Sequence, residues 1–303
     1  MSLLVACSKI TTKIALYAEF VKLEHSIFAL PFALSAAILA TSAWPSMTVL
    51  LWLLLAMVGG RAYGMGLNRL LDRHIDAKNP RTAVRSLPAG RLKLLEAWVL
   101  TFVSLAVLIM ATFQLPLICR QLLPIAIAVL TLYSYTKRFS WLCHWVLGLS
   151  LGCAAIGGWV AVSGQWSWIA VVWGACVMFW VAGFDLLYAC QDADFDRREH
   201  LYSVPARFGV SNAILASRFC HVVTVVLMAL FMSLYHSNTP LNAISWGIVP
   251  LTAGLLIYEQ SLVKADDLSR INEAFFLVNG FLSIAVFGVL LVAKLIPPGL
   301  NSL

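Results

Sequence analysis

The chain has 303 residues, of which 61% are hydrophobic and only 12% are charged, about half the charged share of an ordinary soluble domain. This composition excludes a soluble enzyme, a disordered chain and a nucleic-acid-binding domain. The formal net charge of +7 leaves phosphate-bearing partners open, and the placement of the charges is more informative than their number.

The apolar residues fall into long runs that predict an all-α integral membrane protein. A helix needs roughly 20 mostly apolar residues to cross the ~30 Å hydrocarbon layer of a bilayer. The fourth run is interrupted by Arg120 and Pro124, and the segment 1–24 before the first run has the mixed charge of an amphipathic surface segment. The sequence therefore predicts nine transmembrane helices in one domain over 1–303: 25–43, 48–70, 95–114, 118–136, 141–163, 167–190, 211–235, 241–262 and 272–296.

Basic residues are concentrated on one side of this topology. With a cytoplasmic N-terminus, all of the 21 Lys and Arg residues lie at the cytoplasmic face except Arg61, Arg120 and Lys294. Such a bias is what the positive-inside rule describes. The sequence thus predicts that the two long connections, 71–94 and 191–210, form cytoplasmic cap loops.

The second predicted span ends in a polar cluster, NRLLDRHID. Its residues Asn68, Asp72 and Asp76 are spaced i, i+4, i+8, which places them on one face of a helix on successive turns. Like charges at this spacing destabilise a helix, and charge at membrane depth is costlier still. The arrangement is typical of a site that takes up a cation.

The sixth predicted span ends in a second cluster, DLLYACQDADFD, which contains Asp185. Its residues Tyr188, Asp192 and Asp196 repeat the i, i+4, i+8 spacing, 120 residues after the first cluster. The two spans run in the same direction, so we expect the clusters to lie at the same level and to face each other.

Facing carboxylates point to magnesium and phosphate chemistry. Mg²⁺ prefers oxygen ligands and is typically held by one or two carboxylates plus substrate phosphates. No His/Cys ligand set suggests zinc, and no GxxxxGK[ST] loop suggests a P-loop. Two metal sites could hold a diphosphate and stabilise it as a leaving group.

These stretches resemble a known family. The run NRLLDRHIDAKNPRTAVRSLPAG is similar to the first aspartate-rich motif of the UbiA superfamily of intramembrane prenyltransferases, and DLLYACQDADFDRREH is similar to the second. The run YSYTKRFSWLCHWVLG resembles the family's connection between its fourth and fifth helices. The segment EHSIFALPFAL resembles the branch described as 4-hydroxybenzoate polyprenyltransferase-like.

The resemblance implies nine helices around a central cavity under a cytoplasmic cap, in a bacterial inner membrane with the active site facing the cytoplasm. It implies Mg²⁺-dependent transfer of a polyprenyl chain from polyprenyl diphosphate to a small aromatic acid, in ubiquinone or menaquinone synthesis. The implied metal ligands are Asn68, Asp72, Asp76, Asp192 and Asp196, and the implied residues near the substrates are Arg61, Arg81, Arg85, Lys137, Arg138, Asp185 and Tyr188.

Some individual roles stay open at this stage. Asp185 could act as a base or orient its neighbours, and Tyr188 could stabilise an allylic cation or mark the membrane interface. Arg61, inside an apolar span, could bind the carboxylate of the acceptor or pair with a motif aspartate. His74, His144 and His200 are interpreted as ordinary histidines of loops and helix ends.

Two alternatives remain for the function. The acceptor could be a dihydroxynaphthoate of futalosine-route menaquinone synthesis, since the sequence does not identify the ring. A transporter could also carry acidic cytoplasmic loops. It would, however, need ionisable groups near the membrane midplane, and the half of the predicted spans away from the cytoplasm has almost none. The oligomeric state is not indicated by the sequence.

Overall fold

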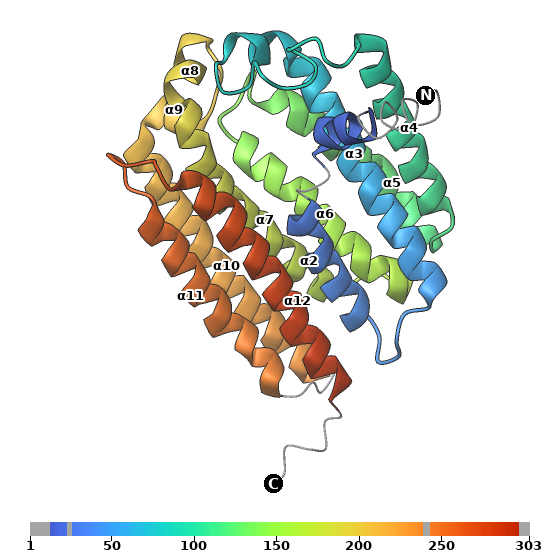
Figure 1. The fold of residues 1–303 in the computed structure, drawn as a ribbon. Coiled ribbons are helices and arrows are strands. Elements are labelled where there is room, and N and C mark those ends of the chain that lie inside the picture. Colours follow the sequence, from blue (N-terminus) through green and yellow to red (C-terminus); the bar gives the residue numbers. More distant parts are fainter. Residues whose placement is uncertain (1–12, 23–25, 239–242, 297–303) are drawn as a thin grey trace, which may run out of the picture.

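The computed structural model describes residues 13–22, 26–238 and 243–296, and helices make up nearly all of this part of the chain (Figure 1). A helix over 13–21 comes first. The elements that follow are α2 (Ser26–Leu39), α3 (Met47–Lys78), α4 (Leu94–Phe113), α5 (Leu117–Thr136), α6 (Cys143–Ser163), α7 (Trp168–Ala189), η2 (Cys190–Asp192), α8 (Ala193–Arg198), α9 (Val204–Phe208), α10 (Val210–Asn238), η3 (Ala243–Gly247), α11 (Ile248–Leu262), η4 (Glu273–Val278) and α12 (Asn279–Leu295).

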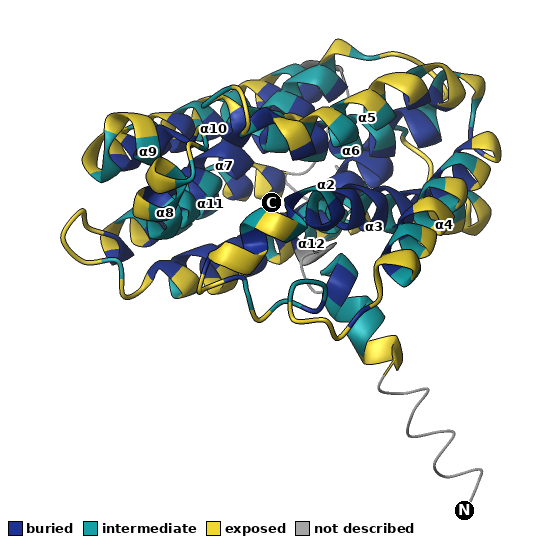
Figure 2. Ribbon diagram, turned by 90° about the horizontal axis from the view of Figure 1, so that it is seen from above, coloured by how far each residue is buried: buried dark blue, intermediate teal, exposed yellow. Residues whose placement is uncertain are grey.

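Within the described ranges, each of the nine predicted spans coincides with a helix. Seven helices are long and apolar enough to cross a membrane, whereas α2 has 14 residues and α11 has 15. Seen from above, buried residues face the interior and exposed ones line the outside of the bundle (Figure 2). Exposed apolar side chains such as Phe102, Leu215 and Ile257 lie on the outer surface, as lipid contact requires.

Small residues bring the central helices together. α6 packs along α7 and α2. A Cβ at Gly148 would lie 2.2 Å from the carbonyl oxygen of Met178 in α7, and a Cβ at Gly158 would lie 2.2 Å from that of Ala33 in α2. Glycine is therefore required at both positions for the backbones to approach, as in other membrane helix pairs.

One end of the bundle carries residues 79–93, α8 and α9, at the top of Figure 1, and we call it the cap end. The predicted loop 71–94 begins as helix, because α3 continues without a break to Lys78. Of the predicted amphipathic segment 1–24, the described part is helical over 13–21 and buries Phe20 beside Leu70. Residues 1–12 and 23–24 lie outside the described ranges.

The last span begins with a π-helical stretch, η4. A π-helix bonds residue i to i+5 and is frequent at functional sites. The Asn279 side chain follows it and donates hydrogen bonds to the carbonyls of Ala274 and Phe275, at 3.0 and 3.3 Å, and to the buried Glu259 at 2.9 Å. Trp180 of α7 donates to the Asn279 amide oxygen at 2.7 Å, so the widened segment is held to its neighbours by polar contacts.

Candidate functional site

The first aspartate cluster lies on the cap-end turns of α3. The helix is continuous here, so Asn68, Asp72 and Asp76 lie on one face as the spacing predicts. Asp72 is 1% exposed, and its carboxylate contacts Lys137 Nζ at 2.6 Å and Arg138 Nη2 at 2.8 Å. The basic residues that follow α5 therefore neutralise the first carboxylate of the cluster.

The second carboxylate of this cluster is paired within its own segment. Arg85, in the connection after α3, contacts both oxygens of Asp76, at 2.9 and 2.8 Å. Thr82 donates to the backbone carbonyl of Asp76 at 3.0 Å, which fixes the path of the connection as it leaves the helix. The connection is thereby folded back over the end of α3.

The second aspartate cluster follows a broken helical path. After Tyr188 the chain passes through the 3₁₀ turn η2 into α8, yet Tyr188, Asp192 and Asp196 still line one cavity. Asp194 does not: its side chain is 88% exposed and pairs with Arg197 on the surface at 3.0 Å. The two residues Asp192 and Asp194 thus face opposite environments.

Direct hydrogen bonds join the second cluster to the connection that follows α3. Asp192 accepts from Asn79 Nδ2 and from Arg81 Nε, both at 3.0 Å, and Arg81 Nη2 makes a further ion pair with it. Arg81 Nη1 also donates to the Tyr188 hydroxyl at 3.0 Å, and its guanidinium carbon lies 5.2 Å from the centre of the tyrosine ring. The segment after the first motif therefore contacts the second motif directly.

The remaining carboxylates have neutral or imidazole partners. Asp196 accepts from the Ser203 hydroxyl at 2.9 Å. Asp185 lies 2.7 Å from Nδ1 of His144, a residue that is 2% exposed. His144 is thus a buried part of the site, and its interpretation as an ordinary helix-end histidine was wrong. His74 and His200 are exposed, as expected.

These side chains enclose a polar cavity of about 170 Å³. The predicted residues that line it are Asn68, Asp72, Asp76, Arg81, Arg85, Lys137, Asp185, Tyr188, Asp192 and Asp196. Arg138 is linked to it through Asp72, and Arg61 lines a different cavity. Further lining residues were not predicted as site residues, among them Asn79, Tyr133, His144 and Ser203.

Two of the basic residues are strongly held in their charged forms. Burial alone would lower the pKa of Lys137, but Asp72 and the nearby carboxylates outweigh this effect and raise it above its ordinary value. Burial likewise opposes the charged form of Arg81, and its contacts with Asp192 and Tyr188 raise its pKa. Both cations therefore stay charged at any physiological pH.

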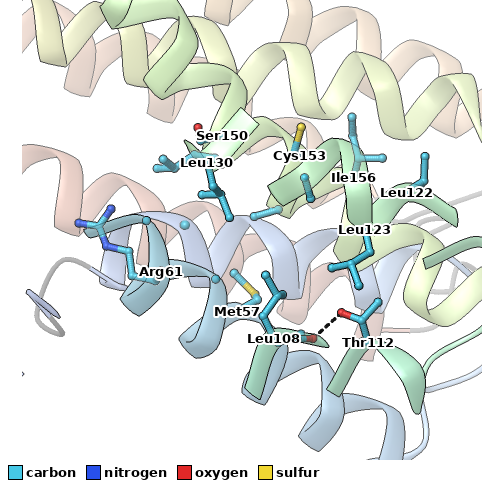
Figure 3. A pocket seen from close by; sticks show the side chains of 18 of the residues that line it. Met57, Arg61, Leu108, Thr112, Leu122, Leu123, Leu130, Ser150, Cys153 and Ile156 are labelled. Atoms are coloured by element: carbon cyan, nitrogen blue, oxygen red, sulfur yellow. Dashed lines mark hydrogen bonds between the residues drawn. The ribbon is translucent and has the colours of Figure 1, made fainter. Parts of the chain in front are cut away.

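A second cavity, of about 330 Å³, is almost entirely apolar (Figure 3). Two of its hydroxyl groups are satisfied by their own helices, since Thr112 donates to the carbonyl of Leu108 at 2.7 Å and Ser150 to that of Val146 at 3.0 Å. Among the described residues that line it, Arg61 is the one with a charged side chain. Tyr133 lines both cavities, so the polar and apolar cavities share a wall.

The donor set fits a hard cation better than a soft one. Five cavity-lining carboxylates and two side-chain amides offer oxygen ligands, which Mg²⁺ prefers. Among the described residues, however, no group of three or more His, Cys, Asp or Glu side chains is placed to hold a metal ion by itself. A metal here would complete its coordination with water or with the oxygens of a bound anion such as a diphosphate.

The family model and the most similar curated relatives point to the same kind of protein. Residues 29–284 match the UbiA prenyltransferase family. The chain is 31% identical over 251 residues to a 4-hydroxybenzoate octaprenyltransferase of Haemophilus ducreyi, covering 82% of this chain and 87% of the relative. It is 29% identical to the enzyme of the same name from Actinobacillus pleuropneumoniae, covering 91% and 93%.

Solved structures show the same fold. The apo structure of a UbiA homolog from Aeropyrum pernix superimposes with a TM-score of 0.80 and 34% identity, covering 90% of this chain and 98% of that one. A UbiA homolog from Archaeoglobus fulgidus, bound to GPP and Mg²⁺, superimposes with a TM-score of 0.74 at 18% identity, covering 93% and 100%.

Proposed function

The chain belongs to the UbiA prenyltransferase family, and from that premise we propose that it transfers a polyprenyl chain from polyprenyl diphosphate to 4-hydroxybenzoate. The observation that carries the proposal is the junction of two aspartate clusters around one polar cavity, next to an apolar cavity. The names of the relatives support the choice of acceptor and the prenyl class of donor.

The polar cavity is proposed as the diphosphate site. Arg81, Arg85, Lys137 and Arg138 already point their charges at its carboxylates, and the guanidinium groups can bind phosphate oxygens through paired donors. When the diphosphate binds, these cations can exchange a carboxylate for a phosphate oxygen. Such an exchange keeps every buried charge paired, which limits the desolvation cost.

The carboxylates released by that exchange, together with Asp196, are the proposed metal ligands. Asp72, Asp76, Asp192 and Asp196 would hold Mg²⁺, with Asn68 as a further oxygen donor. Bound there, Mg²⁺ would supply Lewis-acid stabilisation of the negative charge that develops on the leaving diphosphate. Mg²⁺ bound to the Archaeoglobus fulgidus homolog supports this choice of metal.

The reaction then follows from the placement of the chain's own groups. The C–O bond of the allylic diphosphate breaks with its electron pair on oxygen, and the ring carbon of the acceptor attacks the allylic carbon. The ring loses a proton, and Asp185, at the cavity wall, is the proposed base. Tyr188 contributes an aromatic ring at the same level, which favours nearby positive charge by about 0.5–2 kcal/mol.

The apolar cavity is the proposed site of the first isoprene units, and its dry wall excludes water from a cation that water would destroy. Arg61, at one end of the side chains in Figure 3, is proposed to bind the carboxylate of the aromatic acid. We propose a bacterial inner membrane as its location, since the named relatives are bacterial, and the distribution of basic residues supports a cap end that faces the cytoplasm.

The test is a competition. Purified protein in lipid nanodiscs receives polyprenyl diphosphate, Mg²⁺ and equal amounts of 4-hydroxybenzoate and 1,4-dihydroxynaphthoate, and the products are weighed by mass spectrometry. Prenylated hydroxybenzoate as the main product supports the proposal. Prenylated naphthoate would reassign the acceptor, and diphosphate release with neither product would refute the transferase assignment for both rings.

A further inference from the structure

His144 is a buried titratable side chain for which the reaction above has no use. It lies at the start of α6, is 2% exposed, and contacts two different parts of the site through its two ring nitrogens. Nδ1 lies 2.7 Å from Oδ2 of Asp185, on α7. Nε2 accepts a hydrogen bond from the backbone N–H of Val204, the first residue of α9, at 3.3 Å.

These contacts define the tautomer. A ring nitrogen that accepts from a backbone N–H carries no proton, so the proton of the neutral ring is on Nδ1 and is donated to Asp185. Because Nε2 is occupied, the imidazole is not free to take a proton from a substrate. Its effect is exerted on the carboxylate, whose Oδ2 it holds through the hydrogen bond from Nδ1–H.

The contact also orients Asp185. The carboxylate is 23% exposed and lines the polar cavity. Oδ2 is engaged by His144, and none of the hydrogen bonds made by the described residues engages Oδ1. Oδ1 is therefore the oxygen available to a bound acceptor.

The other nitrogen, Nε2, contacts the segment that enters α9. Val204 directly follows Ser203, whose hydroxyl donates to Asp196 at 2.9 Å and accepts from the N–H of Ala206 at 3.3 Å. By binding the N–H of Val204, His144 therefore supports the segment that presents Ser203 to Asp196. One imidazole thus links the base to the metal-binding side of the site.

We propose that His144 is a positioning residue for prenyl transfer, which holds Asp185 as an oriented carboxylate through Nδ1–H and anchors the Ser203–Val204 segment through Nε2. The role rests on the function proposed above. In the reaction, the bond between the ring carbon of the acceptor and its hydrogen breaks, and the proton passes to Oδ1 of Asp185. His144 keeps its own proton throughout.

Two substitutions separate the two contacts. The amide of Asn lies near the position of Nδ1, whereas that of Gln lies near the position of Nε2. H144N therefore keeps a donor for Asp185 and loses the acceptor for Val204, and H144Q does the reverse. We expect H144Q to lower kcat about 10- to 100-fold, as misplacement of a catalytic group does, with the KM for polyprenyl diphosphate unchanged.

H144N should show the opposite pattern, with a kcat within about threefold of wild type and a raised KM for polyprenyl diphosphate. Equal losses in both variants, or the reverse pattern, would overturn the proposal. Melting temperatures of both proteins in detergent show whether either has lost its fold. If H144N does not fold, H144Q alone still tests the contact with Asp185.

A mutant cycle provides the second measurement. If His144 acts through Asp185, H144Q should cost little further kcat in a D185N background, since interacting residues are not additive. Full additivity would show that His144 acts elsewhere. Failure of the wild-type protein to prenylate any aromatic acid would count against the proposed function, whereas an active wild type with an unimpaired H144Q would count against His144 alone.

Discussion

Asp192 and Asp194 offer a test of the proposed site within three residues of sequence. The side chain of Asp192 is 18% exposed and accepts hydrogen bonds from Arg81 and Asn79. The side chain of Asp194 is 88% exposed and contacts Arg197. The substitution to Asn has the same shape and the same chemistry at both positions. Only the surroundings differ, so D194N is a matched control for D192N.

The expected losses follow from those surroundings. In D192N the Arg81 side chain, 32% exposed, loses its carboxylate partner, which should cost about 1–2 kcal/mol of stability, between the values for exposed and buried pairs. Loss of one group that stabilises developing charge typically lowers kcat about 10²–10³-fold. D194N should change neither quantity appreciably, since an exposed ion pair contributes little.

The assay measures the initial rate of prenyl transfer in nanodiscs over a range of Mg²⁺ concentrations, together with thermal unfolding. The reasoning predicts that D192N shifts the Mg²⁺ dependence to higher concentration as well as lowering kcat. If D192N kept wild-type kcat and Mg²⁺ dependence, or if D194N lost as much as D192N, the assignment of the second cluster as a metal site would be wrong.

Three further outcomes can be tested with the same protein. Removal of divalent metal by EDTA should abolish transfer, and Mg²⁺ should restore it better than Zn²⁺, because the cavity offers oxygen ligands; equal rescue by Zn²⁺ would argue against that ligand set. R61A should raise the KM of the aromatic acid more than that of the diphosphate, and equal effects on both would exclude carboxylate binding by Arg61. G148A places a methyl group 2.2 Å from the Met178 carbonyl oxygen and should cost about 1–3 kcal/mol of stability, measured as a lower melting temperature, whereas G288A, with no atom within 4 Å, should be tolerated.

The sequence predicted the parts of the site that depend on local spacing. The i, i+4, i+8 pattern of Asn68, Asp72 and Asp76 describes a real helical face, because α3 continues through all three. The same spacing predicted that Tyr188, Asp192 and Asp196 lie together, and they do line one cavity. They do not share one continuous helix, however, because the chain passes through the 3₁₀ turn η2. Hydropathy located the spans because lipid contact requires long apolar runs.

The contacts that the sequence could not predict are those between distant segments. His144 is separated from Asp185 by 41 residues and from Val204 by 60, and nothing in its neighbours distinguishes it from a histidine of a solvated helix end. Asn79 is equally uninformative until the fold brings it 3.0 Å from Asp192. The spacing of residues along the chain carries no information about such contacts, because they are determined by how the helices pack against one another.

The π-helical stretch before α12 has a consequence for which changes this protein can tolerate. Within it lies Phe275, whose ring centre is 4.1 Å from that of Tyr188 at the wall of the polar cavity. A π-turn holds one more residue than an α-turn, so deletion of a single residue within 273–278 would convert it to an ordinary α-turn and leave the helix on either side in register. The side chains inside the stretch would be redistributed around the helix, and Phe275 would no longer lie against Tyr188 although the segment stayed just as apolar. The length of this stretch, more than its hydrophobicity, is therefore the constraint on its sequence.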